Sequence, residues 1–226
     1  MKQGKFWLII AAILVLTGVL SVYSYTRKEP KVYAEEVDQV LLTVDDRTLT
    51  VGDLAYYIIA EEQHIEQQAR IYDMEDTNRY WSIRLKGMSF LKSEARRLVI
   101  ETAVHDEIFY QMAKEKGVIL DEDEQRLLES RQYDIWSDLT EEQQAALGVT
   151  KKALWKRMGE IALAQKYQIE YGMEHSVIAE DYEVDGEGYA ELLKEHHYHV
   201  NETLWGRLPF GNILYDHRKE TDSQKE

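Results

Sequence analysis

The chain contains no cysteine and only two prolines among its 226 residues. Without cysteine it can form no disulfide bonds or thiolate metal sites, and it cannot carry a lipid on a cysteine. Two prolines and twelve glycines are also too few for a long flexible linker, since such linkers are rich in these residues. A chain of 226 residues is long enough to form a hydrophobic core, and we expect this core to supply its stability.

The short motifs of common catalytic and nucleotide-binding sites are also missing. The sequence has no phosphate-binding loop, no dinucleotide fingerprint and no serine–histidine–acid arrangement. Its net charge is −15, of which residues 1–31 contribute +4 and the remainder −19. An acidic surface repels nucleic acid but is compatible with basic or neutral polypeptides. We therefore expect no catalytic residue, no cofactor and no nucleic-acid partner.

One long uncharged run is present, at residues 6–25 (FWLIIAAILVLTGVLSVYSY). Its length suits a helix that crosses the hydrocarbon core of a bilayer, and Tyr23 and Tyr25 stand where an interfacial aromatic belt would lie. We predict a retained transmembrane helix over about 6–25; the alternative is a signal peptide that is cleaved after Ser24. Basic residues flank both ends, so the positive-inside rule leaves the orientation open.

The rest of the chain is dominated by helical patterns. Apolar residues at helical spacing predict helices over about 51–72, 88–116, 122–137, 151–174 and 187–199. Residues 88–116 are apolar on two faces, which indicates a helix buried between neighbours at the centre of the domain. We predict three regions: residues 1–31 as a short N-terminus and anchor, 32–215 as one mainly α-helical domain, and 216–226 as a polar tail.

A short segment joins two of these helices, at residues 111–125 (QMAKEKGVILDEDEQ). Gly117 stands where a left-handed glycine closes a helix, and Asp121 can cap the next helix with Glu124 as the reciprocal acid. Three apolar residues, 118–120, lie between them and favour burial. The spacing predicts a fixed elbow rather than a flexible hinge.

Several residue clusters have both a functional and a purely structural interpretation. A metal site is one interpretation of His175, Glu195, His196, His197 and His199; no further ligand spacing supports it, and the alternative is a polar helix face. His105 lies on an apolar helix face, which favours a core histidine over a catalytic one. We therefore predict no metal site.

Aromatic residues are frequent, with fifteen tyrosines and five tryptophans. One N-terminal group contains Tyr56, Tyr57, Tyr72, Tyr80 and Trp81. Such side chains supply large amphipathic contact area at low entropic cost, which suits the binding of varied polypeptides. The group is our candidate for client binding, and the alternative is that these residues belong to the core.

Residues 97–124 (RLVIETAVHDEIFYQMAKEKGVILDEDE) resemble the helix–elbow–helix signature of the SurA/PrsA class of extracytoplasmic chaperones. In that signature an apolar helix ends in A-x-x-x-G, here Ala113 and Gly117, and an apolar link leads to an acidic capped helix. Residues 40–54 resemble the family's opening strand–turn–strand and helix, and residues 149–167 its next long helix. The resemblance covers about 38–170 and, more faintly, 182–215.

The resemblance implies a SurA N-terminal-like multi-helix domain outside the cytoplasm, anchored to the cell membrane by a single span. It also implies that the domain binds unfolded or partly folded secreted polypeptides. Two departures stand out. Most members carry an inserted parvulin-type prolyl isomerase domain of ~100 residues, for which this chain has no room, and Gly18 is followed by Val19 rather than by a lipidated cysteine. The alternatives are a protein related to peptidyl-prolyl isomerases or a dedicated interaction subunit for one cognate partner.

In the resembled family the last strand returns to the first. Residues 40–44 and the stretch around 205–208 both have extended, alternating patterns, while Pro209 and Gly211 mark a turn. We therefore predict a small β-sheet that joins the N- and C-terminal segments and packs on the central helix. The alternative is a loose tail over 200–215 that is docked by Trp205 alone.

Overall fold

The computed structural model describes residues 32–85, 89–175 and 178–215. The predicted transmembrane helix over about 6–25 and the predicted polar tail both lie outside these residues. Among the helices within the described ranges, none combines the length and the apolar character that crossing a bilayer requires.

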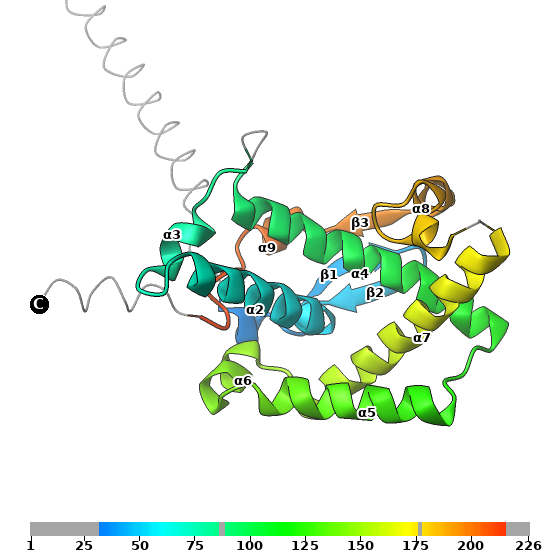
Figure 1. Cartoon of the computed structure of the whole chain (residues 1–226), viewed down its shortest axis with the longest axis horizontal. Coiled ribbons are helices and arrows are strands. Elements are labelled where there is room, and N and C mark those ends of the chain that lie inside the picture. The colour runs from blue at the N-terminus through cyan, green and yellow to red at the C-terminus, as the bar shows by residue number, and fades with distance from the viewer. Residues whose placement is uncertain (1–31, 86–88, 176–177, 216–226) are drawn as a thin grey trace, which may run out of the picture.

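The described part is mainly α-helical, as predicted, and it is organised around one pair of long helices (Figure 1). Helix α4 (Leu91–Lys116) crosses the middle of the molecule, and α7 (Lys151–His175) packs against it. The other α-helices are α2 (Ala55–Tyr72), α3 (Thr77–Trp81), α5 (Glu122–Ser137), α6 (Glu141–Leu147), α8 (Glu187–Leu192) and α9 (Glu202–Trp205). Short 3₁₀ turns are η1 (Tyr33–Glu35), η2 (Gly52–Leu54), η3 (Ala179–Tyr182) and η4 (Leu193–Glu195). The two-faced apolar pattern of α4 explains its central place, since buried residues occur on both sides of it.

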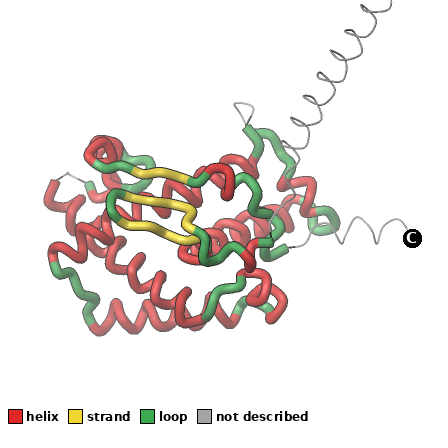
Figure 2. The backbone as a smooth tube through the Cα atoms, turned by 180° about the vertical axis from the view of Figure 1, so that it is seen from behind, coloured by secondary structure: helices red, strands yellow, loops and turns green. Residues whose placement is uncertain are grey.

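Three short strands form a sheet on one side of the helices (Figure 2). The strands are β1 (Val40–Val44), β2 (Arg47–Thr50) and β3 (Tyr198–Val200), in the order β2-β1-β3. Both pairs are antiparallel, so that Leu42 on β1 faces Leu49 on β2 and Val200 on β3. The predicted sheet between the N- and C-terminal segments is therefore confirmed.

The C-terminal strand is not where the sequence pattern placed it. The stretch around 205–208 is not extended, because the Asn201 side chain accepts a hydrogen bond from the backbone nitrogen of Leu204 at 3.0 Å and so caps a short helix, α9. The helix predicted over 187–199 was also wrong in its second half. It ends at Glu195, and the chain then pairs with β1, where the Asp45 nitrogen donates to the His197 carbonyl at 2.7 Å.

The elbow between α4 and α5 is formed by local hydrogen bonds. Gly117 has a φ of 69°, in the left-handed region, and the nitrogen of Val118 donates to the buried Ala113 carbonyl at 2.9 Å. Asp121 then accepts from the backbone nitrogen of Glu124, and the Glu124 carboxylate accepts from the backbone nitrogen of Asp121. Both helix ends are thus satisfied within a few residues, which fixes the direction in which α5 leaves.

The C-terminal segment is held by one buried carboxylate. Glu62 on α2 is fully buried, and its two oxygens accept hydrogen bonds from the backbone nitrogens of Gly211, Ile213 and Leu214. Burial raises the pKa of Glu62 to about 7, against the opposing effect of these hydrogen bonds and of Lys92. The segment after α9 is therefore docked on the helices and is not a loose tail.

The elbow predicts a specific response to substitution at Gly117. No atom lies within 4 Å of a side chain added there, so the cost of Gly117→Val is set by its positive φ. We expect the free energy of unfolding to fall by about 1–3 kcal/mol. Gly117→Asn is the matched control, because asparagine tolerates the left-handed region. Equal thermal midpoints for Val and Asn in a melting experiment would show that the conformation at 117 does not matter.

Glu62 predicts a pH dependence of stability. Its pKa is raised in the folded state from 4.5, so the folded protein binds this proton more tightly than the unfolded chain does. The resulting stabilisation is fully present below about pH 4.5 and is lost as the pH rises through 7. Urea unfolding measures the free energy of unfolding of wild type and of Glu62→Gln at each pH. From pH 5 to pH 8 we expect the wild type to lose stability relative to Glu62→Gln. A difference that is constant over this range would contradict the assignment.

Candidate functional site

The five candidate aromatic residues do not form a single surface. Tyr57 and Trp81 are buried, where the Tyr57 hydroxyl donates to Asp106 and the Trp81 indole donates to Glu66, each at 3.1 Å. Tyr72 and Tyr80 lie beside each other, with ring centroids 5.5 Å apart, and Tyr56 lies in a different place, between α2, α5 and α7. These residues are therefore close in the sequence but do not form one binding site.

Two of the histidines considered as metal ligands, His196 and His175, have other side-chain partners. His196 Nδ1 lies 2.7 Å from the Asp45 carboxylate, which also accepts from the backbone nitrogen of His197. Burial would raise the pKa of Asp45, but these hydrogen bonds hold it below its usual value. The ring of His175 stacks on Tyr171 at 3.9 Å. Within the described ranges no three histidine or acidic side chains are placed to hold a metal ion.

His105 is a core histidine that fastens one segment to α4. Its Nδ1 lies 3.0 Å from Asp106 and its Nε2 lies 2.9 Å from the carbonyl of Tyr182 in η3. Phe109 and Tyr189 pack against the ring, with centroids 4.9 Å and 4.7 Å away. Both ring nitrogens are thus engaged, which leaves neither for a substrate.

A network of buried charges joins α7 to α4 and to the sheet. Arg157 on α7 donates to Glu107 on α4 at 2.8 Å and to Glu160 at 3.0 Å. Arg47 on β2 approaches the same two carboxylates at 3.1 Å and 2.7 Å. Burial alone would lower the pKa of Arg157, but Tyr57 and Glu107 raise it above its ordinary value. The two arginines and two glutamates balance in charge, which indicates a structural network rather than a reactive centre.

This network was not predicted from the sequence. Glu107 and Arg157 have exposed side-chain fractions of 0 % and 3 %, yet charged residues in amphipathic helices ordinarily face solvent. The available signal was their position, since Glu107 lies between Ala103 and Ile108 on α4, and Arg157 lies next to Met158 on α7, among residues that are buried.

An open apolar groove lies between α5 and α7 and has a volume of about 220 Å³. Eight of its twelve lining residues are apolar, among them Tyr56, Leu120 and Met158. Leu127 on α5 and Ile169 on α7 are 54 % and 46 % exposed, so apolar side chains reach the solvent along it. In Figure 1, α7 runs obliquely above α5, and the elbow joins α4 to α5 at the end where α5 and α7 diverge.

Polar contacts hold the two walls of this groove at both ends. At one end the Gln132 amide donates to the Trp155 carbonyl and the Trp155 indole donates to the Gln132 carbonyl, both at 2.8 Å. At the other end Lys166 lies 2.6 Å from Glu124, the elbow's capping acid, and this hydrogen bond lowers the pKa of Glu124. These contacts fix the spacing of α5 and α7 at two points along the groove.

A second, larger cavity has a more strongly charged rim. It has a volume of about 580 Å³ and lies between α4 and residues 184–198. Arg97 and Glu101, which form an ion pair at 2.5 Å, both line it, and Leu98 between them is 41 % exposed. The paired charges make it a less apolar surface than the groove between α5 and α7.

The buried network predicts a large effect of losing one partner. Arg157→Met leaves Glu107 buried without its closest cation, and we expect the free energy of unfolding to fall by about 3–5 kcal/mol. Arg126→Met is the control, because Arg126 pairs with Asp123 on the solvent-exposed surface of α5 and should matter little. Denaturant unfolding measures both; similar losses for the two variants would contradict the structural role of the network.

Comparison with known protein families, curated proteins and solved structures found no match for this chain. The resemblance to the SurA/PrsA class therefore stays an expectation drawn from the sequence alone.

Proposed function

We propose that this protein is a membrane-anchored, extracytoplasmic chaperone-like protein that binds unfolded or partly folded polypeptides without covalent chemistry. The observation that carries the proposal is the open apolar groove between α5 and α7, whose walls are joined by polar contacts at two points. A concave surface lined mainly by apolar side chains with a few polar groups is a common form of binding site.

The size of the groove favours side chains of a polypeptide over a small-molecule ligand. Pockets for drug-sized ligands and cofactors usually span about 300–1,000 Å³ and enclose most of the ligand. The groove has about 220 Å³ and is open, which suits one or two apolar side chains of a longer chain. Leu127 and Ile169 offer the exposed apolar contact on opposite walls.

Charge selects the kind of polypeptide. The chain outside residues 1–31 has a net charge of −19, so the domain as a whole attracts basic segments and repels acidic ones, while Glu124, Arg131 and Lys166 line the groove itself. The proposed occupant is therefore an unfolded segment that combines apolar side chains with net positive charge. The resemblance to the SurA/PrsA class supports a location outside the cytoplasm, and the uncharged run at 6–25 supports anchoring in the membrane.

A peptide-binding experiment tests this function. Full-length protein in detergent micelles is titrated against several unrelated fluorescent peptides, each with net positive charge and several leucines, and anisotropy is measured. Leu127→Asp should weaken binding on the order of tenfold, the cost of losing one buried leucine contact. Leu98→Asp is the matched control, since Leu98 is a partly exposed leucine in the second cavity.

Three outcomes would overturn the proposal. Binding that is lost with Leu98→Asp and kept with Leu127→Asp places the site elsewhere. Equal affinity for matched acidic peptides removes the role of charge. No binding to any unrelated peptide indicates a dedicated subunit with one cognate partner.

A further inference from the structure

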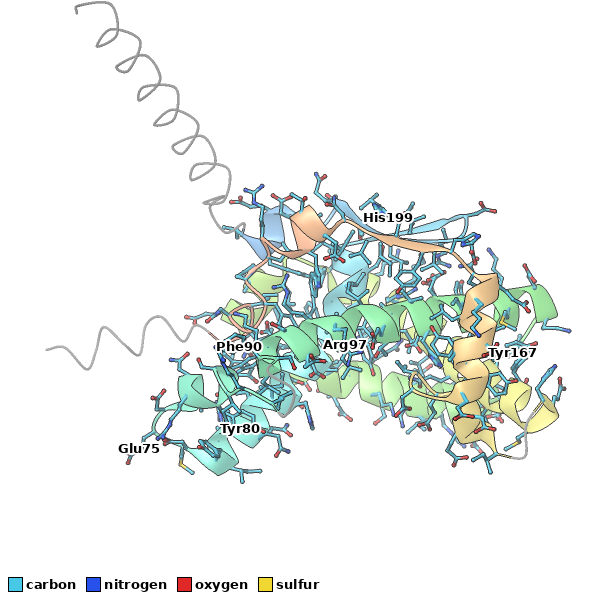
Figure 3. All side chains as sticks on the ribbon, turned by 90° about the horizontal axis from the view of Figure 1, so that it is seen from above. Glu75, Tyr80, Phe90, Arg97, Tyr167 and His199 are labelled. Carbon is cyan, nitrogen blue, oxygen red and sulfur yellow. The ribbon has the colours of Figure 1, made fainter. Side chains whose placement is uncertain are left out.

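Several large apolar side chains are exposed to solvent on the surface around α3. Its exposed members are Ile71 (80 %), Tyr72 (55 %), Met74 (82 %), Leu85 (38 %) and Phe90 (45 %). They come from the end of α2, the loop before α3 and the segment that leads into α4. Figure 3 shows Glu75, Tyr80 and Phe90 of these segments gathered at one end of the molecule. We call this set the α3 surface.

The composition of the α3 surface is that of a membrane interface. Tyr72 and Tyr80 lie beside each other, and the guanidinium of Arg84 stacks on the Phe90 ring at 4.8 Å. Tyrosine and phenylalanine side chains favour the headgroup region, and arginine can lay its apolar stem on a ring while its charge stays in water.

Charge also sets this surface apart. The described residues 70–85 and 89–92 contain four cations and three acids, a balance of +1, whereas the chain outside residues 1–31 has a net charge of −19. This is the sign that anionic lipid headgroups attract. A membrane would therefore repel much of the domain and attract this end of it.

The path of the chain brings the domain close to the bilayer. The uncharged run ends at residue 25, and the described domain begins at Val32. Seven residue steps span at most about 25 Å even when fully extended. The η1 turn lies in the same half of the molecule as α3, on the left in Figures 1 and 3, and Figure 3 shows the two on opposite sides of α4. The short connection thus keeps this end of the domain near the headgroups.

We propose that the α3 surface docks on the lipid interface beside the anchor; this inference rests on the membrane anchor of the proposed function. Because the anchor already confines the domain to the membrane, even a small patch can dock at the resulting high local concentration. Docking fixes the orientation of the domain. Helix α4 begins at this end and extends about 39 Å over its 26 residues, so the elbow points away from the membrane.

The absence of cysteine makes a direct test possible. Met74→Cys and Ile119→Cys each introduce a single thiol at a highly exposed apolar position, 82 % and 77 % exposed in the wild type. Met74 lies on the α3 surface, and Ile119 lies in the elbow at the opposite end of α4. Each full-length variant is labelled with an environment-sensitive nitrobenzoxadiazole dye and reconstituted into vesicles of phosphatidylcholine and phosphatidylglycerol. Quenching by lipids that carry a doxyl group near the headgroup is then measured.

We expect the label at 74 to be quenched severalfold more strongly than the label at 119, with emission shifted to shorter wavelength only when lipid is present. Equal, weak quenching at both positions overturns the proposal. A blue shift at 74 that persists in detergent and is not quenched by doxyl lipid also overturns it, because a second copy of the chain or another protein then covers the surface. The same samples are floated on a density gradient.

Failure of flotation overturns the anchor and the docking together. Flotation without quenching at 74 overturns the docking alone. Peptide binding to the groove is measured separately in detergent and is independent of both results.

Discussion

The ion pair between Glu107 and Arg157 is the interaction on which the arrangement of helices depends. Neither side chain reaches water, so each makes the burial of the other tolerable, and neither helix could keep its present face without the other. Arg47 adds the sheet to the same centre, and Tyr57 adds α2, since its hydroxyl accepts from Arg157 at 3.3 Å. Such a buried network favours a single packing of the helices, because a rotation of α7 would leave a buried charge unpaired.

Once α7 is fixed on α4, the elbow determines how α5 packs on the face of α7 that points away from α4. The left-handed turn at Gly117 and the cap at Asp121 send α5 back along α7, and Gln132 and Trp155 set where the two helices meet. Ile161 is buried against the core, while Ile169, farther along the same helix, remains partly exposed in the groove. The groove is thus a by-product of two rigid constraints and needs no flexible loop to form.

The parts of the fold that follow from the sequence are those with local causes. Gly117, the Asp121–Glu124 pair and the similar Thr140–Gln143 pair that caps α6 act within four residues, so their spacing is enough to predict them. The position of β3 was missed because its residues, including His199, have no strong extended pattern and depend on β1 for their partners. The groove between α5 and α7 could not be foreseen either. Glu62 was missed for a related reason: only the distant backbone of 211–214 explains why a carboxylate is buried there.

The pairing of β1 with β3 has a consequence for how the chain folds during synthesis. Leu42 and Val200 face each other although they are 158 positions apart, so β1 is made long before its second neighbour exists. Until then one edge of β1 stays open, with main-chain groups able to pair with any passing extended segment. The helices can form early from local contacts, whereas the sheet must be completed last. A nascent chain of this protein would therefore have an aggregation-prone strand edge during synthesis. That edge of β1 is covered only after β3, residues 198–200, has been made.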